Sequence, residues 1–314
     1  MWWMLTAALA QELPVQEGVP VGEPVPVGET VPLGEPVVVA EPVALTAEQR
    51  VDEARRRMAA GDWEGTRIVL AEALARWDTM LSENPTDDVR FRRAETLAAL
   101  GRVEEAQAAL DALGDPAGRS PADRSKIELL HGMWRIQLGE VKPGLRALDE
   151  ALTRVPPGEL PQNESRARVV LVETAATAAA GIAFTGSDRK KKKALERRAL
   201  LVKGIQDQLV LLIRLADPPS VIRGFVAAVR AYDDLGAALL AETPPKRLDA
   251  EQLRLNRALL AGRVSNVWVK ASQLAEMGEG WSAQVGYTGP GTAELAARRV
   301  ALEQRIESLP LPSR

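Results

Sequence analysis

From Thr46 onward, apolar residues recur every three to four positions, and alanine, leucine, arginine and glutamate dominate the composition. This spacing places the apolar residues on one face of a helix, so it favours helices over strands. Two local signals mark helix starts. Thr46 and Gln49 form a capping box, and Ser120 precedes Pro121, a residue favoured at the first helical position. The pattern therefore predicts an all-α body.

Three segments of this body align on glycines between predicted helices. Gly61, Gly101 and Gly139 are separated by 40 and 38 residues. Each is followed five positions later by a small or short residue, and four positions after that by a leucine; the pairs are Thr66 and Leu70, Ala106 and Leu110, and Gly144 and Leu148. Small residues let two helices approach closely while the leucine fills the seam, so the alignment predicts helical hairpins.

The repeat is harder to follow beyond Gly158. Residues 165–184 are so apolar that they predict a helix buried on most sides. Two Pro-Pro pairs, after Asp217 and Thr243, mark breaks between later helices. We expect these later helices at residues 192–215, 221–241, 249–277 and 292–309. They suit either an irregular continuation of the stack or a separate bundle.

The hairpin pattern resembles the tetratricopeptide repeat family, in a divergent form, over about residues 47–158. The third copy carries the resemblance best, with the motif's small residues, a leucine and a final proline at Gly132, Gly144, Leu148, Ala151 and Pro156. The family's usual bulky aromatic is replaced by Arg57, Leu97 and Arg135. The resemblance implies a solenoid of helical hairpins with irregular C-terminal helices.

The resemblance also implies a partner-binding groove along the first helix of each pair. Carrying over the motif positions gives Glu48, Val51, Arg55, Met58, Asp88, Phe91, Glu95, Ala98, Lys126, Leu129, Met133 and Ile136. The lysine and asparagine set with which some members bind a C-terminal carboxylate is absent. Val51, Arg55, Phe91, Glu95, Leu129, Met133 and Ile136 predict an apolar floor with a charged rim, which suits a helix or an extended peptide. The alternative is that these side chains only pack against neighbouring helices.

A six-residue phrase precedes the helical body. It reads GEPVPV, GETVPL, GEPVVV and AEPVAL over residues 22–45, after two looser copies. Proline removes backbone donors and fixes φ, so we expect residues 11–45, the stalk, to be a disordered linker of polyproline type. Its six glutamates give it a net charge of −6, which leaves +3 for residues 46–314 because the whole chain is −3. Extended, the stalk would reach on the order of 100 Å.

Residues 1–10 read MWWMLTAALA, an apolar run that ends in a small-x-small site. We expect a signal peptide here, and hence a secreted, periplasmic protein, with an unstructured cytosolic N-terminus as the alternative. The chain contains no cysteine, which excludes disulfides and thiol catalysis and fits either compartment. The expected organisation is a signal peptide at 1–10, a linker at 11–45, repeats at 46–158 and a C-terminal helical region at 159–314.

Five consecutive cations, Arg189, Lys190, Lys191, Lys192 and Lys193, form a basic run near the start of a predicted helix. A helix N-terminus is already partly positive, so this placement indicates either a flexible loop or a site for an anionic surface. The run lacks interleaved aromatic residues, so we expect no nucleic-acid partner. Lipid or lipopolysaccharide remains the alternative, through peripheral membrane contact.

The remaining candidates for chemistry are few. Residues 278–291 are the least helical stretch of the body, and we expect Trp281 and Tyr287 there either to dock a partner or to fold back over the last helices. His131 is the only histidine, with no metal-ligand spacing around it. We therefore expect no cofactor, no metal and no enzyme, with an unrecognised hydrolase as a third hypothesis.

These observations lead to one functional expectation and one main alternative. The expectation is a scaffold that holds a protein partner in the cell envelope, with the stalk as a spacer. The alternative is a helical protein that binds an anionic surface through the basic run. Partner identity and oligomeric state are not predicted by any of these patterns.

Overall fold

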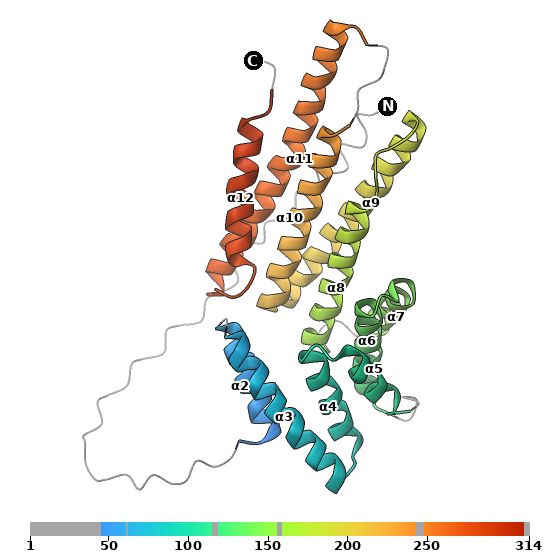
Figure 1. The fold of residues 1–314 in the computed structure, drawn as a ribbon, viewed down its shortest axis with the longest axis vertical. Helices are drawn as coiled ribbons and strands as arrows, with labels where there is room; N and C mark the ends of the chain where they lie inside the picture. The colour runs from blue at the N-terminus through green and yellow to red at the C-terminus, as the bar shows by residue number, and fades with distance from the viewer. Residues whose placement is uncertain (1–44, 61, 115–118, 156–158, 243–247, 311–314) are drawn as a thin grey trace, which may run out of the picture.

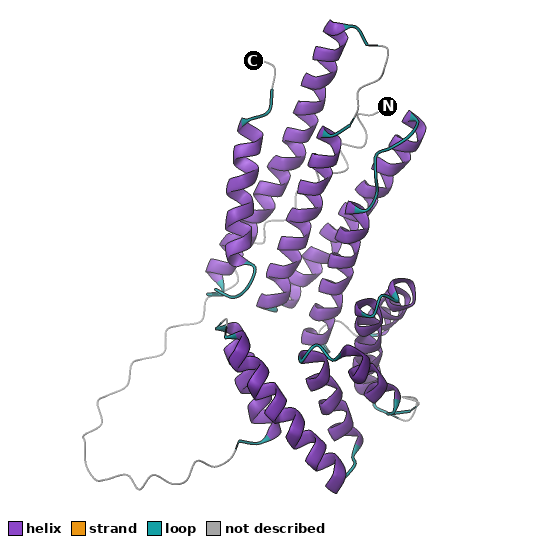
Figure 2. Ribbon diagram, in the orientation of Figure 1, coloured by secondary structure: helices purple, strands orange, loops and turns teal. Residues whose placement is uncertain are grey.

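The computed structural model describes residues 45–60, 62–114, 119–155, 159–242 and 248–310. Within these residues the elements are eleven α-helices, labelled α2 to α12, and no strand (Figures 1 and 2). The all-α prediction is confirmed. The predicted stalk and signal peptide, Gly61 and Pro156 lie outside the described residues, except for the last residue of the stalk, Leu45.

Six helices form three consecutive hairpins, as the glycine alignment predicts. They are α2 (Ala47–Ala59) with α3 (Trp63–Glu83), α4 (Asp87–Ala99) with α5 (Val103–Asp111), and α6 (Pro121–Gln137) with α7 (Val141–Arg154). Gly101 and Gly139 adopt φ values of +79° and +87°, which residues with a Cβ rarely reach. These two glycines therefore make the tight turns inside the second and third hairpins.

The seam residues lie where the sequence places them. A Cβ added to Gly132 would come within 2.7 Å of the Leu148 side chain, and one added to Gly144 within 2.8 Å of the Gly132 carbonyl oxygen. Ala106 and Leu110 are fully buried in the second hairpin. The paired helices thus touch backbone to side chain at their small residues, which fixes the register of each hairpin.

The predicted helix starts are also confirmed. Thr46 and Gln49 exchange both hydrogen bonds of a capping box, and the Ser120 hydroxyl accepts a hydrogen bond from the Asp123 amide. Each cap satisfies amide groups that the first turn of a helix leaves unpaired. Asp249 and Gln252 form a second capping box, at the start of α11.

Helix α8 (Pro161–Ala180) joins the hairpins to the rest of the molecule. Ala167 is buried in the core that the second and third hairpins share, whereas Val169 and Val172 are buried in the core of the last four helices. Its apolar residues serve two cores, as expected for a helix covered on most sides. The division of the chain at residue 158 stays a prediction, because α8 packs on both parts.

The last four helices form a bundle of long antiparallel helices. They are α9 (Asp188–Leu215), α10 (Pro218–Leu240), α11 (Ala250–Gln284) and α12 (Thr292–Glu307). Helix α10 lies at the centre, in contact with α8, α9, α11 and α12. Gly236 allows Trp268 of α11 to approach α10, since an added Cβ would lie 2.3 Å from the indole nitrogen.

Several predicted boundaries are wrong. Helix α9 begins at Asp188 rather than Lys192, so the basic run is helical. Helix α10 begins at Pro218, because Asp217 caps it and proline suits a first turn. Helix α11 continues to Gln284 and includes Gly278 and Gly280. Gly278 is a packing position rather than a helix stop, because an added Cβ would lie 2.8 Å from Leu295 and 3.0 Å from Phe225.

Candidate functional site

The groove residues predicted on α2 remain at the surface. Val51 is half-buried, and Arg55 is exposed and pairs with Asp52 at 2.8 Å on the same helix. Glu48 and Met58 are exposed as well. Helix α2 packs on α3, and α3 in turn packs on α4. The α2 residues are therefore accessible, and Arg55 pairs within its own helix.

A compact cluster forms between α4 and α6. The Lys126 Nζ atom lies 4.1 Å from the centre of the Phe91 ring and 3.4 Å from a carboxylate oxygen of Glu95. Phe91, Glu95 and Lys126, the Phe91 cluster, are all half-buried. Burial lowers the pKa of the Lys126 amine, and the Glu95 carboxylate opposes part of that shift. The amine therefore covers the aromatic face with one charge partner beside it.

The prediction of an open apolar floor is wrong for the groove residues on α6. Leu129 and Met133 are 0% and 5% exposed, so they offer no surface to a partner. Ile136 is half-buried, and its side chain fills the space beside Gly144 in the seam with α7. The reason is that α6 contacts α5, α7 and α8, so nearly every face of this helix is covered. These three residues pack the core, which was the alternative interpretation.

The basic run occupies the first turns of α9. Lys191 pairs with Glu242 at 3.3 Å, and Lys192 lies 3.9 Å from Glu196 one turn along. The acidic Asp188 stands in the same first turn. These carboxylates offset part of the repulsion between the cations and the positive end of the helix. The flexible loop expected for this run is therefore replaced by regular helix.

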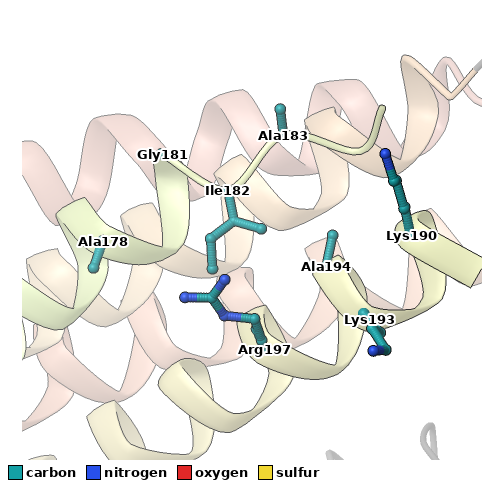
Figure 3. Close-up of a pocket in the computed structure, with 8 residues that line it drawn as sticks. All are labelled: Ala178, Gly181, Ile182, Ala183, Lys190, Lys193, Ala194 and Arg197. Carbon is teal, nitrogen blue, oxygen red and sulfur yellow. The ribbon is translucent and has the colours of Figure 1, made fainter. Parts of the chain in front are cut away.

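An open pocket of about 560 Å³ lies beside the basic run, between α9 and the end of α8 (Figure 3). Its apolar lining consists of Ala178, Gly181, Ile182, Ala183 and Ala194, and its cations are Lys190, Lys193 and Arg197. Figure 3 shows the Arg197 guanidinium directed toward Ile182. Buried Arg198 fixes this corner, because it donates hydrogen bonds to the Ala180 and Asp234 carbonyl oxygens at 2.7 and 3.1 Å.

Sequence reasoning found only part of this pocket. Lys190 and Lys193 belong to the basic run, but Arg197 and Ile182 were not singled out. Arg197 follows Lys193 by four residues and Lys190 by seven, a spacing that places all three on one helix face. The sequence could therefore have predicted the three cations of the pocket from their spacing. It could not have predicted the apolar lining from residues 178–183, because that lining depends on how α8 packs beside α9.

No protein-family model matches the chain, and no curated protein sequence matches it. Among solved structures, the TPR2AB domain of yeast Sti1, in a complex with pHSP90, is similar over 82% of this chain and 98% of its own length. The identity is 17% and the TM-score 0.27. This likeness is too weak to assign a family, a function or a partner to the chain.

The segment with Trp281 and Tyr287 folds back on the bundle. Both side chains are half-buried and pack against the core of the last helices. The Ser282 hydroxyl donates a hydrogen bond to the Tyr287 carbonyl oxygen, which closes the turn after α11. These aromatic residues cover the core, and they form no separate docking loop.

The side chain of His131 contacts polar groups of the neighbouring helix. His131 lies 2.6 Å from the Gln107 amide nitrogen and 3.5 Å from Asp111, and burial lowers its pKa. Among the described residues, no group of three or more His, Asp or Glu side chains could hold a metal ion. None of the helices in the described ranges is long and apolar enough to cross a bilayer.

Proposed function

We propose that the chain is a protein-interaction scaffold whose helical hairpins bind a partner at the Phe91 cluster. The observation that carries this proposal is the Phe91 ring, which stays half-buried on α4 with the Lys126 amine 4.1 Å above it. Aromatic side chains at a partly desolvated surface supply much of the binding energy of protein interfaces. Successive hairpins hold such a surface rigidly, since each pairs through a closely packed seam.

The chemistry of the cluster indicates the kind of partner side chain. An aliphatic or aromatic group would pack on Phe91, and Lys126 and Glu95 would supply polar contacts at its edge. Arg92 lies 3.8 Å from Glu95, so this carboxylate already has two cationic neighbours. A partner that presents an apolar side chain next to a carboxylate would therefore match the cluster better than a cationic one.

Affinity capture with the full chain as bait tests the proposal. Phe91→Ala should weaken the captured interaction about tenfold or more, as expected for a central aromatic anchor. Phe184→Ala is the matched control, because Phe184 is also half-buried and lies under a cation, Arg198, but outside the hairpins. Equal loss in both variants, or in neither, would contradict the assignment of the cluster as a binding surface.

We further propose that this scaffold acts in the cell envelope after export. The support is residues 1–10, whose apolar run ends in Ala8-Leu9-Ala10 directly before the stalk. Mass spectrometry of protein from the native host should find Gln11 at the N-terminus. Intact Met1 in a cytosolic fraction would contradict export without touching the binding proposal.

A further inference from the structure

The bundle has a cationic end, formed where α9 and α11 begin and α10 ends. Lys191 of α9 pairs with Glu242, two residues past the end of α10. Helices α10 and α11 run antiparallel (Figure 1). Their register is given by Trp268 of α11, which donates a hydrogen bond to the Asp233 carbonyl oxygen of α10 at 3.3 Å. Figure 1 shows this end on the side of the bundle away from the hairpins.

The first turns of α11 project beyond the other helices at the cationic end. With Trp268 opposite Asp233 and Gly236, the last residue of α10 lies level with about residue 262 of α11. Residues 250–260 therefore extend past α10 by roughly 16 Å, at 1.5 Å per residue. None of their side chains is buried, and Figure 1 shows the start of α11 standing clear of its neighbours.

The projecting segment exposes two leucines to solvent. Leu255 and Leu259 lie one turn apart and are 53% and 64% exposed. The next residue, Leu260, points to another side of the helix and packs against the bundle core. A helix that exposes leucines where no neighbour covers them is typical of a segment that enters another apolar phase.

Cations without a carboxylate partner lie on the first turns of α9 and on the projecting segment of α11. Within the described residues, six side chains of the cationic end take part in no ion pair; they are Arg189, Lys190, Lys193, Arg197, Arg254 and Arg257. Three of the six cations line the open pocket between α8 and α9.

We propose that the cationic end docks on a bilayer that contains anionic lipids. The leucines of α11 enter the interface between headgroups and acyl chains, while the cations of α9 hold lipid phosphates at and around the pocket. Each Lys or Arg near an anionic bilayer contributes about a fivefold gain in partition, and a single helix with exposed leucines adds apolar area. The proposal concerns the opposite end of the molecule from the Phe91 cluster and does not depend on it.

A bilayer fits these observations better than two other occupants. A second copy of the chain would bring two cationic ends together, which costs free energy by repulsion. An acidic peptide in the pocket would meet Lys190, Lys193 and Arg197 but would leave Leu255 and Leu259 of α11 in water. A bilayer surface contacts both features at once.

Co-flotation of the full chain with vesicles tests the proposal. Vesicles with about 30% phosphatidylglycerol in phosphatidylcholine should bind the protein at least tenfold more strongly than phosphatidylcholine alone, and about 0.5 M salt should weaken that binding. Equal binding to both vesicles, or none to either, would overturn the proposal. Sedimentation of the free chain tests for self-association. If the chain is a dimer, and the double variant Leu255→Ser, Leu259→Ser is a monomer, the leucines serve self-association and the proposal is overturned.

Matched variants separate the two features. The triple variant Lys190→Ser, Lys193→Ser, Arg197→Ser should lose at least tenfold in vesicle binding, and Leu255→Ser with Leu259→Ser a comparable factor. The charge control is Lys142→Ser, Arg146→Ser, Arg166→Ser, three exposed cations near the hairpins; the apolar control is Ile68→Ser with Val141→Ser, which are 52% and 39% exposed. Losses as large in the controls would overturn the assignment to this end.

A spectroscopic readout locates the contact directly. The chain contains no cysteine, so Leu259→Cys accepts a single environment-sensitive fluorophore, and Ile68→Cys provides a second site on α3. Anionic vesicles should shift the emission of the label at residue 259 to the blue and leave the label at residue 68 unchanged. An unchanged spectrum at residue 259, with the protein bound to the vesicles, would show that α11 does not enter the interface and would overturn the proposal.

Discussion

At Gly132 two helices touch so closely that no side chain fits between them. A Cβ there would lie 2.7 Å from Leu148 side-chain atoms and 3.0 Å from the Leu148 backbone nitrogen. We expect Gly132→Ala to destabilise the protein by about 1–3 kcal/mol, because the seam must open to admit the methyl group. Chemical denaturation, followed by circular dichroism, measures the change.

A second glycine provides the control for this residue. Gly204 lies in α9, and a Cβ added there would meet open space. Gly204→Ala should therefore leave stability unchanged or raise it by about 0.5–1 kcal/mol, since alanine reduces the entropy lost on forming the helix. If both variants lost the same stability, the cost at Gly132 would reflect something other than helix contact.

Among the elements, α11 combines a projecting first part with a longer packed part. Residues 250–260 have no buried side chain, whereas Val264, Trp268, Ala271 and Leu274 are buried against the bundle. An isolated helix of fewer than about 12 residues is marginal in water. We expect hydrogen exchange of the amides of residues 254–260 to be much faster than that of residues 264–280 in the same helix.

The central helix α10 serves as the internal reference for this exchange experiment, because it is buried along most of its length. Protection of residues 254–260 equal to that of α10 in the free monomer would contradict a projecting segment. Anionic vesicles should raise the protection of these residues, since the bilayer interface favours a hydrogen-bonded backbone.

Local sequence signals predict where helices begin and turn better than they predict which side chains are buried between helices. Capping boxes and seam glycines act over a few residues, so Thr46 with Gln49 and the turn at Gly139 could be found in the sequence. The burial of Met133 could not, because α6 is covered by three other helices, α5, α7 and α8. The contact of the Lys126 amine with the Phe91 ring likewise joins residues 35 positions apart on two helices, and no local pattern marks it.

Predicted helix boundaries are wrong at two places where distant parts of the chain contact the helix. Cations oppose the positive end of a helix, so the basic run predicts either a flexible loop or a site for an anionic surface, with a helix only from Lys192. In the structure α9 includes the whole run, and Glu242 of a distant segment pairs with Lys191. Gly278 resembles a helix stop, but its lack of a side chain lets Leu295 and Phe225 pack against α11. In both cases the helix is accompanied by a contact with a residue far along the chain, which a local pattern does not include.

For the whole molecule, charge is divided between the stalk and the helical body. The stalk carries −6 and residues 46–314 carry +3, and the body has unpaired cations at its cationic end. Six charges spaced about six residues apart are screened beyond roughly 8 Å at physiological salt, so attraction between stalk and body should be weak. Proline and glutamate leave the stalk too little apolar area to offset the entropy of ordering it.

We therefore expect deletion of residues 11–43 to leave the melting temperature of the body nearly unchanged. Calorimetry of the full chain and the deletion variant, at about 20 mM and about 300 mM salt, measures the difference under weak and strong screening. A loss of several degrees at low salt alone would show that the glutamates dock on the cations of the body. A loss at both salt concentrations would show that valine and proline side chains of the stalk pack on the body, because apolar contacts do not weaken with added salt.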